Sequence, residues 1–221
     1  MKSEFKKRLL TSIILLPAVS LIIFYNQHLF IFLLIVILFF SSKEWFCLNK
    51  NKINTTTILG FIFVILSVIF AYLLRGEDMM SIILFFWLIL IGVFSDLGGY
   101  VFGKTFGGKK ITRVSPNKTY AGMYGSFIFS LFPSAFFYLS NIKIFIYNYN
   151  TETYFLFYIS LTLLLSLICQ IGDLTVSYFK RQNNFKDTGN ILPGHGGLLD
   201  RIDGILFVIF FAGLLKIFGI I

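Results

Sequence analysis

The sequence has 221 residues, of which 57% are hydrophobic, 29 are phenylalanine and only 13% are charged. This composition excludes an ordinary soluble domain and places the chain in a lipid bilayer. The net charge of +9 does not indicate nucleic acid binding, because charged membrane loops and attraction to anionic lipid explain it. Cys47 and Cys169 indicate neither a disulfide framework nor a thiolate metal site, and we expect both to be small buried hydrophobic residues.

Seven stretches of the sequence approach the roughly 20 mostly apolar residues that a transmembrane helix needs. We therefore predict an all-α fold, a polytopic integral membrane bundle of about seven transmembrane helices. The predicted helices cover residues 9–25, 29–42, 57–74, 81–97, 121–140, 154–176 and 199–219. The first helix is expected to remain uncleaved, although Lys and Arg precede it as in a signal peptide. The short gap 26–28 joins it to the second helix as a hairpin.

Lys and Arg residues are distributed unequally between alternate loops. Fifteen of them lie at the amino terminus and in the regions 43–52, 104–118 and 180–186, against three on the other side. Short cytoplasmic loops accumulate positive charge. This asymmetry predicts a cytoplasmic amino terminus and an external carboxyl terminus.

A basic, glycine-rich segment follows the fourth predicted helix. Residues 103–118 hold five Lys or Arg residues and no acid, including Lys104 and Lys118, with Ser115 between them. Glycines free backbone N–H groups, and a helix is predicted to start just after Lys118. The segment could therefore bind a triphosphate or, equally, a lipid headgroup. The Gly-x-x-x-Gly spacings within 99–107 are interpreted as loop glycines rather than as a helix-packing face.

Four aspartates lie within or at the ends of predicted helices, where an acid is costly and usually functional. They are Asp96, Asp173, Asp200 and Asp203. All four fall on the predicted cytoplasmic side. Asp173, Ser177 and Lys180 share one stripe of the sixth helix, and Asp200 and Asp203 are neighbours at the start of the seventh. In the alternative interpretation, these acids only pair with nearby Lys and Arg.

A carboxylate cluster ringed by cations suits phosphoryl or nucleotidyl transfer. Hard divalent cations prefer oxygen ligands, and Mg²⁺ usually takes one or two carboxylates together with substrate phosphates. Lys and Arg would hold the remaining phosphate oxygens. Asp187, beside Lys186, is equally well explained as a surface ion pair.

The densest polar stretch of the chain carries a long pattern of fixed residues. It is Ser177-x-x-Lys180-Arg181-x4-Lys186-Asp187-x-Gly189-x-x-Leu192-Pro193-x-His195-Gly196-Gly197-x-x-Asp200-Arg201-x-Asp203. At every fixed position this pattern resembles the signature of the phosphatidate cytidylyltransferases, or CDP-diacylglycerol synthases. The upstream segment beginning at Asp96 resembles a second region that the family shares. There, Ala121 stands where the family commonly has an acidic residue, which puts a metal or base role at that position in doubt.

The resemblance implies an enzyme that converts CTP and phosphatidate into CDP-diacylglycerol and pyrophosphate by in-line attack on the α-phosphorus. It implies Mg²⁺, alone or with a second cation such as K⁺, as the cofactor. The implied metal ligands are Asp173, Asp200 and Asp203. The implied catalytic residues are these three with Lys180 and Arg181. The implied substrate-binding residues are Ser177, Lys186, His195, Gly196, Gly197, Arg201, Lys104, Lys118 and Ser115.

The resemblance also implies a homodimer in a bacterial inner membrane, with its active-site loops in the cytoplasm. We expect residues 1–221 to form a single membrane-embedded domain. Amino-terminal helices would occupy 1–95. A catalytic part, 96–221, would carry the cytoplasmic loops 98–120 and 177–199.

Three other functions fit parts of the pattern. A CTP-dependent kinase or cytidylyltransferase for another lipid, such as a polyprenol or an ether lipid, has the same apolar helices. A cation- or proton-coupled transporter would also bury acids, but near the bilayer midplane and in broken helices. A scaffold subunit would leave the charge density of 177–203 unexplained.

Overall fold

The computed structural model describes residues 17–112, 115, 118–140, 142, 151–189, 191 and 196–221, and only the backbone of 151–154. These residues are helical apart from turns, irregular stretches and isolated bridge residues, which confirms the predicted all-α fold. A helical stretch over 17–25 precedes the longer helices. These are α2 (Gln27–Leu48), α3 (Thr55–Arg75), α4 (Met79–Phe106), α5 (Tyr120–Leu139), α6 (Thr151–Gln182) and α7 (Leu199–Ile217).

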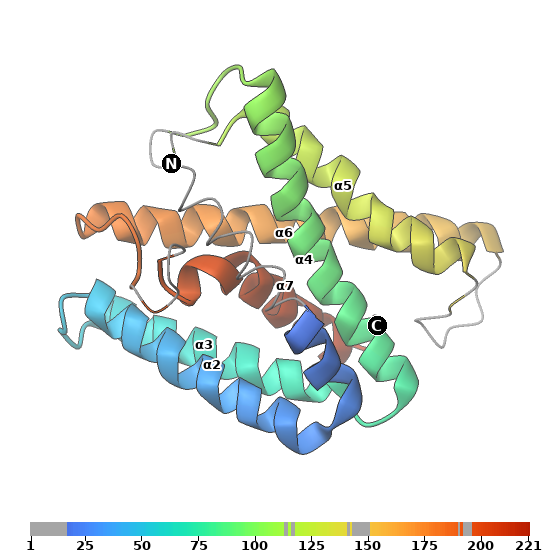
Figure 1. The fold of residues 1–221 in the computed structure, drawn as a ribbon, viewed down its shortest axis with the longest axis horizontal. Helices are drawn as coiled ribbons and strands as arrows, with labels where there is room; N and C mark the ends of the chain where they lie inside the picture. The colour runs from blue at the N-terminus through green and yellow to red at the C-terminus, as the bar shows by residue number, and fades with distance from the viewer. Residues whose placement is uncertain are drawn as a thin grey trace.

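Two helix pairs, α2 with α3 and α4 with α5, pack around α6 and α7. In Figure 1, α2 and α3 run side by side, α7 lies between α3 and α6, and α4 crosses in front of α6. The most extensive helix pair is α4 with α5, followed by α6 with α7. The last two helices therefore lie at the centre, where residues from the other helices can reach them.

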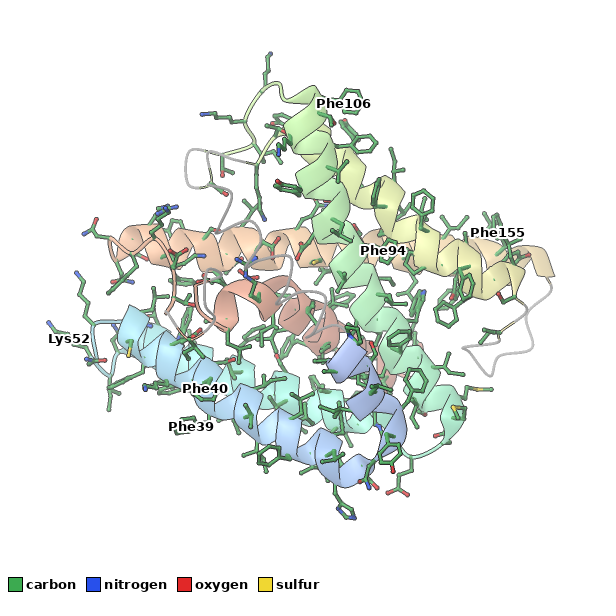
Figure 2. The ribbon with its side chains drawn as sticks, viewed as in Figure 1. Phe39, Phe40, Lys52, Phe94, Phe106 and Phe155 are labelled. Carbon is green, nitrogen blue, oxygen red and sulfur yellow. The ribbon has the colours of Figure 1, made fainter. Side chains whose placement is uncertain are left out.

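The outer surface of the bundle is hydrophobic. Large apolar side chains point outward, among them Phe39, Phe106 and Phe155 at the periphery of Figure 2. Five helices, α2 to α6, are long and apolar enough to cross a membrane among the residues that the structure describes. Lipid-facing apolar side chains around a hydrogen-bonded helical backbone are what a bilayer requires. The chain is an integral membrane protein.

Three helices continue well beyond their predicted ends. Helix α2 runs to Leu48 instead of residue 42. Helix α4 runs to Phe106 instead of residue 97, and α6 runs to Gln182 instead of residue 176. The connecting segments are therefore 107–119 and 183–198, shorter than the predicted loops 98–120 and 177–199. Polar and glycine residues had suggested loops, but tertiary packing outweighs these weak local preferences.

Glycines bring α4 and α5 into backbone contact. A Cβ added to Gly99 would lie 2.8 Å from Oγ of Ser126, and one added to Gly122 would lie 2.7 Å from the carbonyl oxygen of Gly99. Small residues at such spacings let two membrane helices approach closely. The interpretation of Gly99 and Gly103 as loop glycines is therefore wrong. It holds for Gly107, which ends α4 with a φ of +59°.

The bundle interior contains hydrogen-bonded polar groups as well as apolar ones. Trp87 is fully buried, and its Nε1 donates to Oγ of Ser134 at 3.0 Å. The hydroxyl of Ser134 in turn lies 2.8 Å from that of Thr162, which links α4, α5 and α6. Such bonds are stabilising in lipid because exposed polar groups would find no water there.

Most helices begin with a side-chain cap supplied by the preceding residue. Asn54, Asp78 and Thr119 accept the backbone N–H groups that open α3, α4 and α5. Helix α7 differs, because its N-cap residue, Leu198, has no side chain that can accept a hydrogen bond. The first N–H groups of α7 therefore need acceptors from elsewhere in the fold.

Candidate active site

The segment before α5 places Lys118 next to α6. Lys110 and Thr119 form an antiparallel bridge, and the N–H of Ile111 donates to the carbonyl oxygen of Lys118 at 2.9 Å. These bonds fold the segment back on itself. The Nζ atom of Lys118 then lies 3.0 Å from Oδ2 of Asp173.

Three acidic or thiol side chains gather around Asp173. One ligand atom each from Asp96, Cys169 and Asp173 lies within 4.8 Å of the other two. The Asp203 carboxylate is buried and lies close enough to that of Asp173 for the two charges to interact directly. We call Asp96, Cys169, Asp173 and Asp203 the acidic cluster.

Gly204 allows α7 to approach the acidic cluster. A Cβ at this position would lie 2.6 Å from Oδ1 of Asp173 and 2.6 Å from Sγ of Cys169. At such distances a neighbour must shift, so a larger residue here would displace Asp173 or Cys169. The absence of a side chain at Gly204 therefore keeps Asp203 next to Asp173.

One carboxylate oxygen of the acidic cluster lacks a hydrogen-bond donor and could bind a cation. Oδ1 of Asp173 is buried and has no hydrogen-bond partner among the described residues. A buried acceptor without a donor is rare in proteins, and nearby negative charge makes it more costly. The donor set of three carboxylates suits a hard divalent cation such as Mg²⁺. The thiol of Cys169 does not, because sulfur prefers softer metals.

A cavity of about 340 Å³ opens beside the acidic cluster. Its volume falls within the range of about 300–1,000 Å³ that is common for small-molecule sites. Both acids and cations line it, drawn from α4 to α7 and the 107–119 segment. The charged or polar lining residues are Asp96, Tyr100, Ser115, Lys118, Thr119, Ser126, Gln170, Asp173 and Arg201.

A second group of polar contacts surrounds Asp200 at the start of α7. Nζ of Lys180 lies 2.6 Å from its Oδ1, and the backbone N–H groups of Thr188 and Gly197 donate to its Oδ2 at 2.8 and 3.1 Å. Gly196 has a φ of +85°, which favours glycine. We call Lys180, Thr188, Gly197 and Asp200 the Asp200 network.

Comparisons with known proteins identify the family of this chain. A sequence model described as the cytidylyltransferase family matches residues 49–218. The chain belongs to this family. It is 34% identical to a Rickettsia conorii protein named phosphatidate cytidylyltransferase, over 98% of this chain and 93% of that one. It is 37% identical to a Staphylococcus aureus protein of the same name, over 73% of this chain and 60% of that one.

The cavity and the acidic cluster contain several of the residues predicted from the sequence. Lys118, Ser115 and Arg201 line the cavity, and Asp173 and Asp203 lie in the acidic cluster. The resemblance to the family and the membership of the enzyme class are confirmed. The residue roles stay predictions.

Other predicted residues of the cytidylyltransferase lie outside the cavity lining. Asp200 and Lys180 belong to the Asp200 network, while Arg181 is exposed and donates to the carbonyl oxygen of Phe185 at 3.2 Å. Lys104 is exposed and packs over the ring of Tyr100. The remaining positions are Ser177, half-buried on α6, the exposed Lys186, and Gly196 and Gly197 beside Asp200; His195 is outside the described residues.

Sequence reasoning missed three residues of this region. Cys169 was expected to be a small buried hydrophobic residue, and it is buried as predicted but lies beside two aspartates. The same prediction is wrong for Cys47, which is exposed near the end of α2. Glu44 accepts three hydrogen bonds from the segments that flank Asp200. The signal for Glu44 was present, because it is an acid within an apolar helix. For Thr188 the sequence offered none.

Proposed function

We propose that this cytidylyltransferase condenses CTP with phosphatidate to form CDP-diacylglycerol and pyrophosphate. The observation that carries the proposal is the Lys118–Asp173 pair, which lies at the wall of a cavity beside three buried or cavity-lining carboxylates. The relatives from Rickettsia and Staphylococcus, which carry the name phosphatidate cytidylyltransferase, support the choice of substrate.

The reaction requires one bond to form and one to break. A phosphate oxygen of phosphatidate bonds to the α-phosphorus of CTP, and the bond from that phosphorus to the bridging oxygen of the β-phosphate breaks. Pyrophosphate leaves with the electron pair, so no oxidant, reductant or further reactant is needed. The protein therefore contributes by positioning and by charge stabilisation.

Cationic side chains of the cavity hold the phosphates. Lys118 and Arg201 line the same cavity from the 107–119 segment and from α7. A guanidinium can bind two phosphate oxygens at once, whereas an ammonium acts as a point charge. Glycines at 99 and 122 leave backbone exposed to the cavity, where a ligand can approach closely.

Carboxylates of the acidic cluster would hold Mg²⁺. We assign Asp173 and Asp203 to this role, as predicted from the sequence, and add Asp96. When bound, the ion supplies polarisation of the phosphorus centre and neutralises the leaving pyrophosphate. Asp200 remains a predicted further ligand, because its three donors leave about one of the four acceptor sites of a carboxylate open.

Position in the membrane and assembly complete the proposal. We infer that the amino terminus and the segments 107–119 and 183–198 face the cytoplasm of a bacterial cell, on the basis of the distribution of Lys and Arg. We further propose a single domain, a homodimer, and a second cation such as K⁺. The family match begins at residue 49, so it extends well into the part, 1–95, that we had separated from the catalytic part.

The test is an assay of the purified protein in mixed micelles with Mg²⁺ and CTP labelled in either the α- or the γ-phosphate. Label from the α-phosphate is expected in the lipid fraction with phosphatidate, and not with a polyprenol or diacylglycerol. Transfer of the γ-label alone, to any lipid alcohol, would identify a CTP-dependent kinase instead. Cytidylyl transfer to a different lipid phosphate would overturn the choice of phosphatidate.

A further inference from the structure

Glu44 is a buried carboxylate at the end of α2 that nothing above assigns to the reaction. Only 3% of it is exposed, and it lies before the first residue of the family match. It does not line the cavity beside the acidic cluster. Burial of a carboxylate is costly unless hydrogen bonds satisfy it. The groups that donate hydrogen bonds to Glu44 therefore indicate its structural role.

All three of its donors belong to the segments on either side of 190–195. The Thr188 hydroxyl donates to Oε2 at 2.9 Å, and the backbone N–H groups of Leu198 and Leu199 donate to Oε1 and Oε2 at 2.8 and 2.7 Å. Leu198 and Leu199 open α7, the helix that lacks a cap of its own. Glu44 thus caps α7 from another helix, where a negative charge also matches the positive end of the helix dipole.

The same segments also bind Asp200. Thr188 gives its hydroxyl to Glu44 and its backbone N–H to Asp200, and Gly197 donates to Asp200 immediately before the two residues that donate to Glu44. The carboxylates of Glu44 and Asp200 therefore both accept hydrogen bonds from Thr188 and from the residues around the start of α7. A shift of Thr188 or of the start of α7 away from Glu44 would therefore also move the hydrogen-bond donors of Asp200.

Glycines leave room for Glu44 between these segments. A Cβ added to Gly189 would lie 2.8 Å from Oε1, and one added to Gly197 would lie 2.5 Å from Oε2. Trp45 reinforces the same end of α2: its ring meets that of Phe179 at 5.2 Å. Phe179 directly precedes Lys180 in the chain, so α2 supports both partners of the Lys180–Asp200 ion pair.

We propose that Glu44 is a positioning residue, which holds Thr188 and the first turn of α7 so that Asp200 and Lys180 keep their places in the reaction. Glu44 itself touches no substrate. Its kinetic effect rests on the proposed function, whereas its structural effect on residues 188–199 does not.

The experiment compares Glu44→Gln with Glu77→Gln in the purified full-length protein. Glu77 is exposed in the turn before α4 and accepts a hydrogen bond from Gln27, at the other end of α2. In Glu44→Gln, an NH₂ group must face one of the backbone donors, which leaves that buried donor unpaired. The cost of such a donor, about 1–3 kcal/mol, is confined to the ends of the 183–198 segment.

Two measurements decide the outcome. Hydrogen exchange of peptides that contain Thr188 and Gly197–Leu199 is expected to accelerate at least about tenfold in Glu44→Gln, with α5 unchanged. The kcat for cytidylyl transfer is expected to fall at least about tenfold while the KM for CTP changes little. Glu77→Gln should match the wild type in both. Wild-type exchange near Thr188, or faster exchange throughout the helices, would overturn the proposal.

A second pair of variants covers the case in which Glu44→Gln does not fold. Thr188→Val removes the hydroxyl that donates to Glu44, and Thr188→Ser keeps it. Only the valine variant should accelerate local exchange and lower kcat, and equal behaviour of the two would count against Glu44. If the wild type transfers no cytidylyl group at all, the proposed function fails, and the exchange measurements still decide the role of Glu44.

Discussion

The Nζ atom of Lys118 lies 3.0 Å from Oδ2 of Asp173, across 55 positions of the sequence. The two side chains are 29% and 18% exposed, so the pair stands at the boundary between the cavity and the acidic cluster. An ammonium group at this position can exchange a carboxylate partner for a substrate phosphate, since both are anionic acceptors. The pair therefore connects substrate binding with the carboxylates.

Replacement of Asp173 by Asn tests the carboxylate side of this pair. Asp173→Asn retains shape but removes the charge beside Lys118, and loss of one electrostatic group from an active site costs about 10²–10³ in kcat. We expect that loss in the labelled-CTP assay. Asp78→Asn, at the exposed N-cap of α4, is the matched control and should retain wild-type turnover. Activity of Asp173→Asn within about threefold of the wild type would remove Asp173 from the site.

Replacement of Lys118 by Ala tests the phosphate side. The variant loses a charge-assisted contact, worth about 1.5–3 kcal/mol, so the apparent KM for CTP should rise at least about tenfold. Lys118→Arg keeps the charge, and its KM for CTP should lie between those of the wild type and Lys118→Ala. The control is Lys52→Ala, an exposed lysine in the turn between α2 and α3 that is labelled in Figure 2. An unchanged KM in Lys118→Ala would show that the cavity is not the CTP site.

Enlargement of Gly204 tests the close approach of α6 and α7. A methyl group there would lie 2.6 Å from both Asp173 and Cys169, so Gly204→Ala should separate Asp203 from Asp173 and lower kcat strongly. Gly103→Ala provides the comparison, because a Cβ at that helical position is 3.4 Å from its nearest contact. It should keep activity and gain up to about 1 kcal/mol of helix stability, measured by thermal unfolding in detergent. Equal activity of the two variants would contradict the assigned packing.

Metal dependence tests the acidic cluster as a whole. Chelation should abolish turnover of the wild type, and added Mg²⁺ should restore it. In Asp96→Asn, the Mg²⁺ concentration for half-maximal turnover should rise about 10–100-fold, as is typical when a group near a metal is lost. Calorimetric titration with Mg²⁺ and CTP should show the same shift. Turnover that persists in excess chelator would exclude the proposed ion.

The sequence predicted the helices well and drew attention to the acids because both signals are local. A run of apolar residues defines a span by its length, and an aspartate in such a run draws attention by its cost. The course of α4 beyond residue 97 was not predictable in this way. It depends on Gly99 meeting α5, and glycines are also typical of loops.

Contacts between distant segments were also beyond the sequence. Glu44 and Leu199 are 155 positions apart, and no spacing rule connects residues that far apart. Cys169 was interpreted correctly as buried. Its neighbour Asp173 lies one turn further along the same helix, but its neighbour Asp96 comes from the crossing of α4 over α6. Patterns within one helix predict which side chains share a face. They do not predict which other helix that face meets.

The glycine contact between α4 and α5 packs these two membrane helices together as one rigid unit. Helices that touch through their backbones cannot tilt independently, because no flexible side chain separates them. A bilayer that is thinner or thicker than the apolar length of the pair changes helix tilt, and here both members would lean together, carrying Asp96 and the segment of Lys118 with them. The rate of this enzyme is therefore expected to depend on the acyl-chain length of the lipid in which it is reconstituted.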